Sequence, residues 1–338
     1  MTNRIFYFAF VFIAIFALVR IDALAQTRTR NTAPAATPLM SSLPKSDAVA
    51  QVKMKQLFNE AMPRILANNP SRLAQVNASV ENFKTRTGLD PRMFDEVAVG
   101  IRFTFPGEGT AQAQTVALAK GAYSSTALIT AGSLAASGKY RQEKYQGKTI
   151  YIFTLDESIT VLGVFDFKIN ELAVLPIDAN TLALGDLASV RSVIDVTRAS
   201  QRANAELVAL ASRDPNAVIG FGANMSEQLI RSVDIIGNAP IGDDFARLKQ
   251  VYGSVATTEK DLELFLGGLA PNAEVANSLS LTLNDLKNVA SIFVGRLSGA
   301  RGVLAKSALT NLKIVAVTNE LRIRTAVPSA DIGPLMGN

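Results

Sequence analysis

The sequence predicts an α+β protein of two similar lobes, each a mostly antiparallel sheet covered by helices, behind a cleaved signal peptide and a flexible tether. Three observations predict this class. Short segments of alternating apolar residues are joined by tight turns, which suits antiparallel strands because parallel strands need long crossovers. Segments with apolar residues at intervals of three and four lie between them and are typical of amphipathic helices. The order of these signals in the first half of the chain returns in the second.

The N-terminus carries the sharpest pattern in the chain. Arg4 precedes an unbroken apolar run, and the small residues Ala23 and Ala25 stand before Gln26. A basic start, a short apolar core and an Ala-x-Ala end are typical of a secretory signal peptide. We therefore expect residues 1–25 to be removed and the protein to be exported, to the periplasm or outside the cell. An uncleaved anchor is the alternative, although a membrane-spanning helix needs roughly 20 apolar residues.

Residues 26–43 are predicted to form a flexible linker. The segment contains Pro34 and Pro38, several Thr, Asn and Ala residues, and basic residues without an acid. Such a composition buries too little apolar surface to order itself. We expect the folded part to begin near Leu43-Pro44.

Residues 44–200 form the first predicted α+β repeat. Helices are expected after the first strand, from Pro70, from Ser124 or Ser125, and from a cap at Asp186. A hairpin turn is expected at Gln146-Gly147. The expected strands are 47–52, 96–103, 115–120, 140–145, 148–153, 161–165, 172–177 and 181–184.

Residues 212–338 form the second predicted repeat. Helices are expected over 225–235 and over much of 271–297, although the alternation of 278–283 leaves a strand open there. The strand pair near the C-terminus matches the pair 172–177 and 181–184, which favours duplication over chance similarity. The expected strands are 214–221, 251–257, 262–266, 312–317 and 321–325.

A weak resemblance can be named from these repeats. The Asp-x-x-Ala starts at Asp47 and Asp214 and the Leu-Ala-Val…Asn-Thr-Leu-Ala-Leu-Gly ending at 172–185 resemble uncharacterised exported bacterial proteins with a duplicated α+β unit. The resemblance covers most of the chain after the signal peptide. It contains no diagnostic motif, and it implies no activity for any single residue.

The composition excludes several kinds of chemistry. The chain has no Cys, His or Trp. It therefore has no disulfide, no Ser-His-Asp triad and no zinc, haem or iron–sulfur site that uses His or Cys ligands. Carboxylate chemistry, Lys or Tyr bases and Ser-Lys dyads remain open. We expect no cofactor and no metal. The net charge of +5 is weakly basic and lacks the clustered Lys and Arg that nucleic acid requires.

Two short motifs are better explained by local structure than by catalysis. The segment 220–222, Gly-Phe-Gly, begins like a dinucleotide fingerprint, but Met225 takes the place of the third glycine. We interpret it as a close turn between strand and helix. The segment 42–45 has the Ser-x-x-Lys spacing of some acyl-transfer enzymes, but Pro44 does not suit one helical turn.

One basic and aromatic segment is a possible partner-contact surface. It comprises Tyr140, Arg141, Lys144, Tyr145 and Lys148 on the predicted hairpin. Exposed Tyr and Arg suit contact with an anionic envelope component or a protein. The solvated face of an amphipathic hairpin is the alternative interpretation.

The function that this sequence favours is a non-catalytic binding or scaffold role in the bacterial envelope or periplasm. The alternatives are a hydrolase that uses carboxylates or a Ser-Lys dyad, and a carrier of an apolar ligand. The expected partner is an envelope protein or a small apolar ligand, not nucleic acid. Membrane contact is expected only through an uncleaved signal segment.

Overall fold

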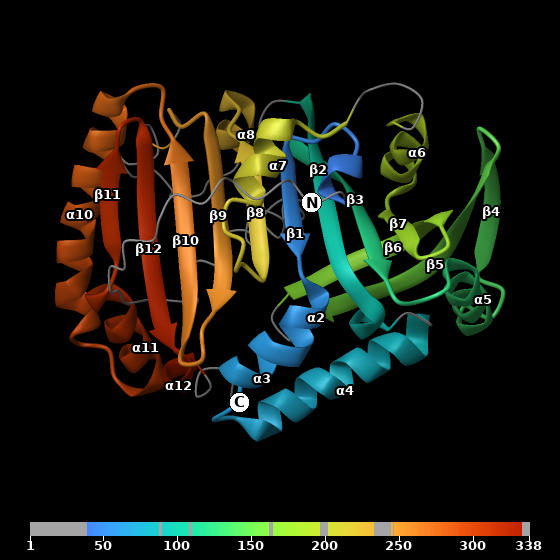
Figure 1. Cartoon of the computed structure of the whole chain (residues 1–338), viewed down its shortest axis with the longest axis horizontal. Helices are drawn as coiled ribbons and strands as arrows, with labels where there is room; N and C mark the ends of the chain where they lie inside the picture. Colours follow the sequence, from blue (N-terminus) through green and yellow to red (C-terminus); the bar gives the residue numbers. More distant parts are fainter. Residues whose placement is uncertain are drawn as a thin grey trace.

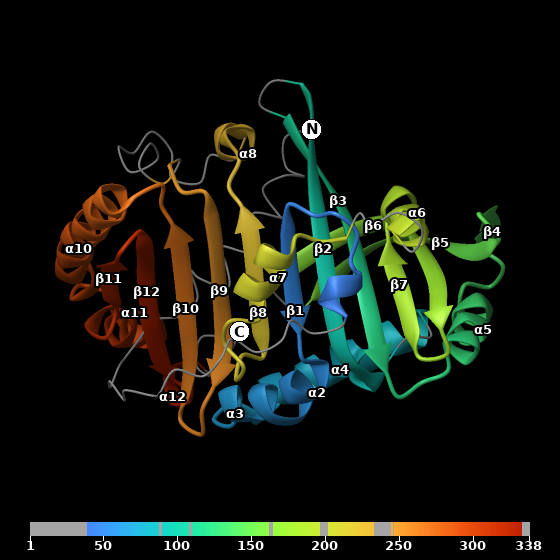
Figure 2. The same ribbon diagram turned by 45° about the horizontal axis from the view of Figure 1, so that its top comes forward.

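A computed structural model describes residues 39–87, 90–107, 110–161, 165–196, 202–232, 245 and 247–332. The described residues combine helices with a large antiparallel sheet, which confirms the predicted α+β class (Figures 1 and 2). The prediction gave each half a sheet of its own, whereas the strands of both halves form one continuous sheet. The predicted cleavage residues Ala23, Ala25 and Gln26 lie outside the described ranges.

The sheet has twelve strands in the order β11-β12-β10-β9-β8-β1-β2-β3-β7-β6-β5-β4. Every neighbouring pair is antiparallel. The strands are β1 (Ala48–Val52), β2 (Phe94–Gly107), β3 (Thr110–Gly121), β4 (Tyr140–Tyr145), β5 (Lys148–Val161), β6 (Phe165–Asp178), β7 (Thr181–Gly185), β8 (Ile219–Asn224), β9 (Gln250–Thr257), β10 (Asp261–Leu269), β11 (Lys313–Val317) and β12 (Glu320–Pro328).

Helices connect these strands and cover the sheet. The longer ones are α4 (Pro70–Thr87), α5 (Ser125–Ala135), α6 (Leu187–Val196), α7 (Ala205–Ala211), α10 (Ala273–Val294) and α11 (Gly299–Thr310). The short ones are η1 (Met40–Ser42), α2 (Met54–Gln56), η2 (Leu57–Ala61), α3 (Met62–Ile65), η3 (Pro91–Met93), α8 (Glu227–Ser232) and α12 (Ser329–Ile332).

The two predicted repeats meet in the middle of this sheet. Strands β1 and β8 pair antiparallel, with Val49 opposite Gly222. Counted outwards from this pair, the first half has the order β1-β2-β3-β7-β6 and the second has β8-β9-β10-β12-β11. The β4–β5 hairpin extends the first half only. A duplicated unit requires this equal strand order, and the duplication stays a prediction.

Different helices cover the two faces of the sheet. On one, called the α7 face, η1, α6 and α7 enclose a core with buried Val49, Leu118 and Ile152. On the opposite face, called the α10 face, the helices from α2 to α5 cover the first half and α10 to α12 cover the second. The helices that pack on β11 and β12 all lie on the α10 face, so Val315 remains 49% exposed on the other side.

Five features differ from the sequence predictions. The folded part begins by Leu39, because Leu39, Met40 and Leu43 are buried, so the predicted linker ends several residues too late. The predicted strand 161–165 lies where β5 ends and β6 begins, and these two strands pair as one long hairpin. The alternating segment 278–283 is helical within α10. Helices α7 and α11 were not predicted.

Side-chain caps explain why several helices begin where the sequence indicates. The Ser124 hydroxyl accepts a hydrogen bond from the Ala127 amide at 3.3 Å at the start of α5. The Asp186 carboxylate accepts from the Ser189 amide and from the Thr115 amide, so it joins α6 to β3. At η3, hydrogen bonds from Arg92 to Asp90 lower the pKa of that carboxyl to about 2, against the opposing effect of burial.

The turn between β11 and β12 offers a prediction on stability. Thr318 has φ of 54° there, a left-handed conformation that is unfavourable for a β-branched residue. Thr318→Gly removes this strain but makes the unfolded chain more flexible, so we expect a net stabilisation of about 0.5–1 kcal/mol. Chemical denaturation measures the change. A loss of stability would mean that the Thr318 hydroxyl, which donates to the Val317 carbonyl at 2.6 Å, outweighs the strain.

Candidate functional site

The predicted partner-contact residues lie at one edge of the sheet. Tyr140, Arg141, Lys144 and Tyr145 belong to the edge strand β4, and Lys148 begins β5. Tyr140 stacks on Phe153, with ring centroids 5.6 Å apart.

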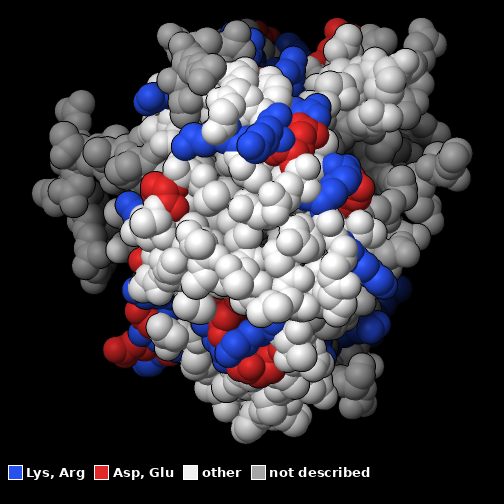
Figure 3. Space-filling model, turned by 90° about the vertical axis from the view of Figure 1, so that its right-hand side faces the viewer, with Lys and Arg blue, Asp and Glu red and all other residues white. Residues whose placement is uncertain are grey.

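Several polar and charged groups of this edge are paired, among them Arg141 but not, within the described residues, Lys144 and Lys148. Arg141 and Glu171 form an exposed ion pair at 3.0 Å. The Tyr145 hydroxyl donates to the Asp195 carboxylate at 3.2 Å. The Arg191 guanidinium lies 5.6 Å from the centre of the Tyr145 ring and also forms an ion pair with Glu143. Acidic and basic side chains lie next to each other on this end of the molecule (Figure 3). Charges on an edge strand also oppose edge-to-edge aggregation, so the contact surface stays a prediction.

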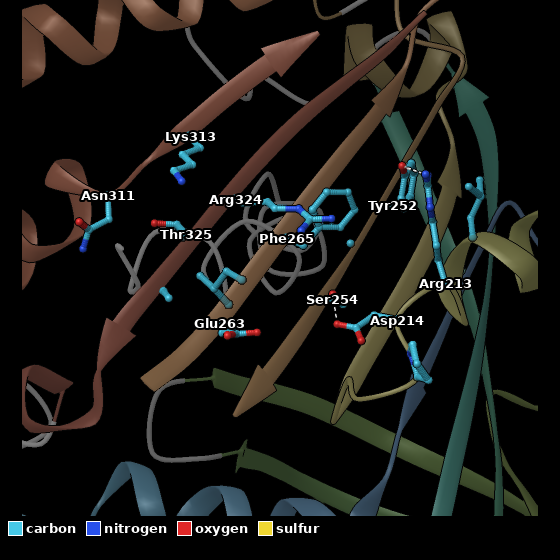
Figure 4. A pocket seen from close by; sticks show the side chains of 15 residues that line it. Arg213, Asp214, Tyr252, Ser254, Glu263, Phe265, Asn311, Lys313, Arg324 and Thr325 are labelled. Atoms are coloured by element: carbon cyan, nitrogen blue, oxygen red, sulfur yellow. Dashed lines mark hydrogen bonds between the residues drawn. The ribbon is translucent and has the colours of Figure 1, made fainter. Parts of the chain in front are cut away.

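A cavity that the sequence analysis did not predict lies on the α7 face of the second half (Figure 4). Its volume is about 560 Å³. Strands β9, β10, β11 and β12 form its floor, and the segment after α7 forms one wall. It is lined by Leu210, Arg213, Asp214, Pro215, Tyr252, Gly253, Ser254, Glu263, Leu264, Phe265, Asn311, Lys313, Arg324, Thr325 and Ala326.

A buried ionic cluster supports one side of the cavity. The Glu320 carboxylate accepts hydrogen bonds from Arg213 at 2.7 Å and from Arg322 at 2.7 Å, and it also accepts from the Tyr252 hydroxyl. Burial acts to raise the pKa of Glu320, but the two guanidinium groups outweigh burial and lower it. A β-carbon at Gly267 would lie 2.2 Å from Tyr252 Cζ, so the absence of a side chain there makes room for the tyrosine ring.

Two further cations, Lys313 and Arg324, face the cavity. Lys313 of β11 and Arg324 of β12 are directly opposite each other in the sheet, so their side chains share the α7 face. Arg324 lies 5.0 Å above the ring of Phe265, its neighbour on β10. No carboxylate of the described residues lies within 4.0 Å of either cation. Like charges at directly opposite positions destabilise a sheet, and a bound anion would relieve that repulsion.

Two carboxylates line another part of the cavity. Asp214 accepts hydrogen bonds from the Ser254 hydroxyl at 3.1 Å and from the Asn216 amide at 3.0 Å. Burial raises the pKa of Glu263, the charges of Asp214 and Asp261 raise it further, and the charge of Arg324 acts in the opposite direction. The cavity therefore has a cationic side at β11 and β12 and an acidic side at Asp214 and Glu263.

The short motifs of the sequence do not form a site. The segment 220–222 lies within β8, not at a turn, and α7 packs directly on it. This corrects the interpretation as a strand–helix turn. In segment 42–45, Ser42 is the last residue of η1, whereas Lys45 follows Pro44, which forms an isolated β-bridge with Arg202. Ser42 and Lys45 are therefore not on one helical turn. The described part of the chain contains no cluster of three acidic groups suited to a metal ion.

The charged side of the cavity has a signal that the sequence already contained. Glu320, Arg322 and Arg324 alternate along one strand and so project to one face. An ionic alternation in an otherwise apolar strand indicates a face that is not covered by a helix. The contributions of Arg213 and Tyr252 have no such signal, because they come from distant segments.

Comparison with known proteins leaves the family open. No protein-family model matches the chain, and no curated protein matches its sequence. The solved structures similar to it include crystal form III of TP0453, with 10% identity, a TM-score of 0.47 and coverage of 88% of this chain and 97% of that chain. Crystal form I of TP0453 has 10% identity, a TM-score of 0.43 and coverage of 90% and 99%. This agrees with the predicted absence of a characterised family.

None of the described helices combines the length and the apolar character needed to cross a membrane.

Proposed function

We propose that this protein is an exported, non-catalytic binding protein whose cavity on the α7 face holds a small ligand with an anionic group. The signal-peptide pattern supports export to the periplasm or the exterior. The observation that carries the binding role is the pair Lys313 and Arg324. These adjacent cations have no carboxylate of the described residues within 4.0 Å, and they face a cavity of about 560 Å³.

The chemistry of the lining supports an ionic rather than an apolar ligand. Five charged side chains line the cavity, and burying them under an apolar molecule would remove their water without replacing its hydrogen bonds. Arg324 suits a carboxylate or phosphate group because its guanidinium donates two parallel hydrogen bonds. The Phe265 ring beneath it holds the guanidinium in place and adds an apolar contact for the body of the ligand.

A carboxylate-dependent hydrolase is the second candidate. Asp214 and Glu263 line the same cavity, and the raised pKa of Glu263 suits a general acid whereas Asp214 is held by Ser254. The cavity is open to solvent and the chain has no tryptophan on which a sugar could stack, so we favour binding over hydrolysis of a sugar.

Calorimetric titration with inorganic phosphate, a dicarboxylate and a sugar phosphate tests the binding role. We expect at least one of these probes to bind, and Lys313→Gln together with Arg324→Gln to weaken it by ten- to a hundred-fold, because a hydrogen bond to a charged group contributes about 1.5–3 kcal/mol. Arg324→Lys should retain part of the affinity.

Lys120→Gln is the matched control, since Lys120 is exposed on β3, away from the cavity. Equal loss in the control and the cavity variants, or no binding of any probe, would rule out the anion site. Mass spectrometry of each probe after incubation separates the two candidates: a product that disappears in Glu263→Gln would indicate the hydrolase.

A further inference from the structure

The outer surface of α10 is apolar although it faces solvent. Leu286, Val289, Ile292 and Phe293 are between 43% and 63% exposed on this helix. Leu297 after the helix and Val303 on α11 extend the exposed group. These six residues are called the α10 surface. A contiguous exposed apolar surface in a folded protein indicates contact with another molecule or a membrane.

The pattern of the helix explains why this surface is not part of the core. Near its start α10 buries Val275 and Leu279 against the sheet, and near its end it buries Val294. The four α10 residues of this surface and Leu281, which is 69% exposed, lie within an arc of about 140° at 100° per residue. At 100° per residue, Leu286 and Phe293 lie on the same side of the helix as the buried Val275 and Leu279. The described residues therefore cover this side in the first half of α10 and leave it exposed in the second.

The charge around the α10 surface is mainly positive, although Asp331 of α12 accepts a hydrogen bond from Ser307 of α11. From Leu286 to Asn319 the chain contains five basic residues and no acid. Three of the cations, Arg296, Arg301 and Lys306, are exposed beside the surface. Asp285 stands at its N-terminal edge. Exposed apolar residues bordered by Lys and Arg are typical of a helix that lies in the interface of an anionic bilayer.

The position of α10 suits this contact. The helix forms one end of the molecule, with α11 beside it, in both views of the fold (Figures 1 and 2). A convex helix can lower its apolar side chains into a fluid layer of lipid without a matching cavity on a partner. A second copy of the chain is disfavoured because it would bring the same excess of cations against these cations.

We propose that the α10 surface docks the protein on an anionic membrane, with Ile292 and Phe293 entering the lipid and Arg296, Arg301 and Lys306 contacting the headgroups. This goes beyond the proposed ligand site and does not depend on it. It also departs from the sequence expectation that only an uncleaved signal segment touches a membrane.

The test uses a local probe in the full chain, because the N-terminal apolar run can bind lipid by itself. The sequence has no Cys, so one introduced Cys carries a single environment-sensitive fluorophore. Val289→Cys places the label on the α10 surface. Ser291→Cys is the matched control, about 160° away around the same helix.

With vesicles of 30% phosphatidylglycerol in phosphatidylcholine we expect a blue shift for the label at 289 and none at 291. Pure phosphatidylcholine should give a weaker shift. Arg296→Gln, Arg301→Gln and Lys306→Gln together should weaken the response about a hundred-fold, since each cation near an anionic surface contributes about 1 kcal/mol. Ile292→Ser with Phe293→Ser should abolish it, with an unchanged circular dichroism spectrum as the check on folding.

Three results would overturn the proposal. In the first, the label at 289 stays in water at every lipid composition. In the second, both labels shift equally, which would indicate unfolding on the vesicle. A shift at 289 that rises with protein concentration without lipid, together with a dimer in sedimentation, would assign the surface to a second copy instead.

Discussion

Gly220→Ala is expected to lower the free energy of unfolding by about 3 kcal/mol. A β-carbon at position 220 would lie 2.1 Å from the Ala211 carbonyl oxygen, which belongs to the backbone of α7. A backbone atom cannot rotate away as a side chain can, so α7 has to move. The helix carries Leu207, Val208 and Ala211 into the core of the α7 face, and this packing would be lost with it. Overpacking a well-filled core costs about 1–3 kcal/mol even before such losses.

Urea unfolding followed by circular dichroism measures this change. Gly295→Ala is the control, because its β-carbon would meet nothing closer than 3.7 Å and its backbone does not require glycine. The control should be neutral or slightly stabilising, since alanine favours helical backbone over glycine. A loss below about 1 kcal/mol for Gly220→Ala would show that α7 does not pack tightly on β8.

Glu320→Gln is expected to cost about 2 kcal/mol at pH 7. The buried carboxylate is shared by Arg213 and Arg322, and the amide leaves both guanidinium groups without a charge partner. Removing one member of a fully buried pair costs about 3–5 kcal/mol, and the partial exposure of the Arg213 side chain reduces this figure.

The pH dependence of the Glu320 variant has a definite sign. The pKa of Glu320 is lower in the folded protein than its ordinary value, so its stabilisation is complete above that ordinary value. The stabilisation is lost as the pH falls through the lowered folded pKa. The difference in melting temperature between wild type and Glu320→Gln should therefore become smaller below about pH 4.

Glu171→Gln is the matched control for the charge change. Its ion pair with Arg141 is about half exposed on both sides, and such pairs contribute about 0–1 kcal/mol. A cost for Glu320→Gln that equals the control at every pH would mean that the ionic cluster does not support the cavity wall.

Local patterns in the sequence account for most of the secondary structure. Alternation at 312–317 and 321–325 predicted β11 and β12, and Ser124 and Asp186 predicted the starts of α5 and α6. These signals are readable because they depend on neighbours within one strand or one helical turn. The alternation at 278–283 left a strand open where the chain is helical, because apolar residues lie on two sides of the helix there: Leu279 is fully buried and Leu281 is exposed.

The candidate cavity was not predictable in the same way. Arg213 and Glu320 are 107 positions apart in the chain, and Tyr252 lies between them in sequence but against both in space. Glu320, Arg322 and Arg324 share a strand and therefore show a visible ionic alternation. No described helix covers the α7 face at β10 to β12, because α10 to α12 pack on the opposite face. A pattern within one strand or helix does not predict on which face a helix packs.

The sequence alone therefore determined the α+β class, the antiparallel strand pairs and the chemistry that a chain without His and Cys lacks. These follow from residue type, from periodicity and from short turns, all of which act over a few residues. The tertiary structure decided that both halves share one sheet through β1 and β8, that the α7 face is open over β10 to β12, and that α10 has an apolar outer side. Such features arise from contacts between distant segments, whose free energy depends on how the elements pack and not on the pattern within any one of them.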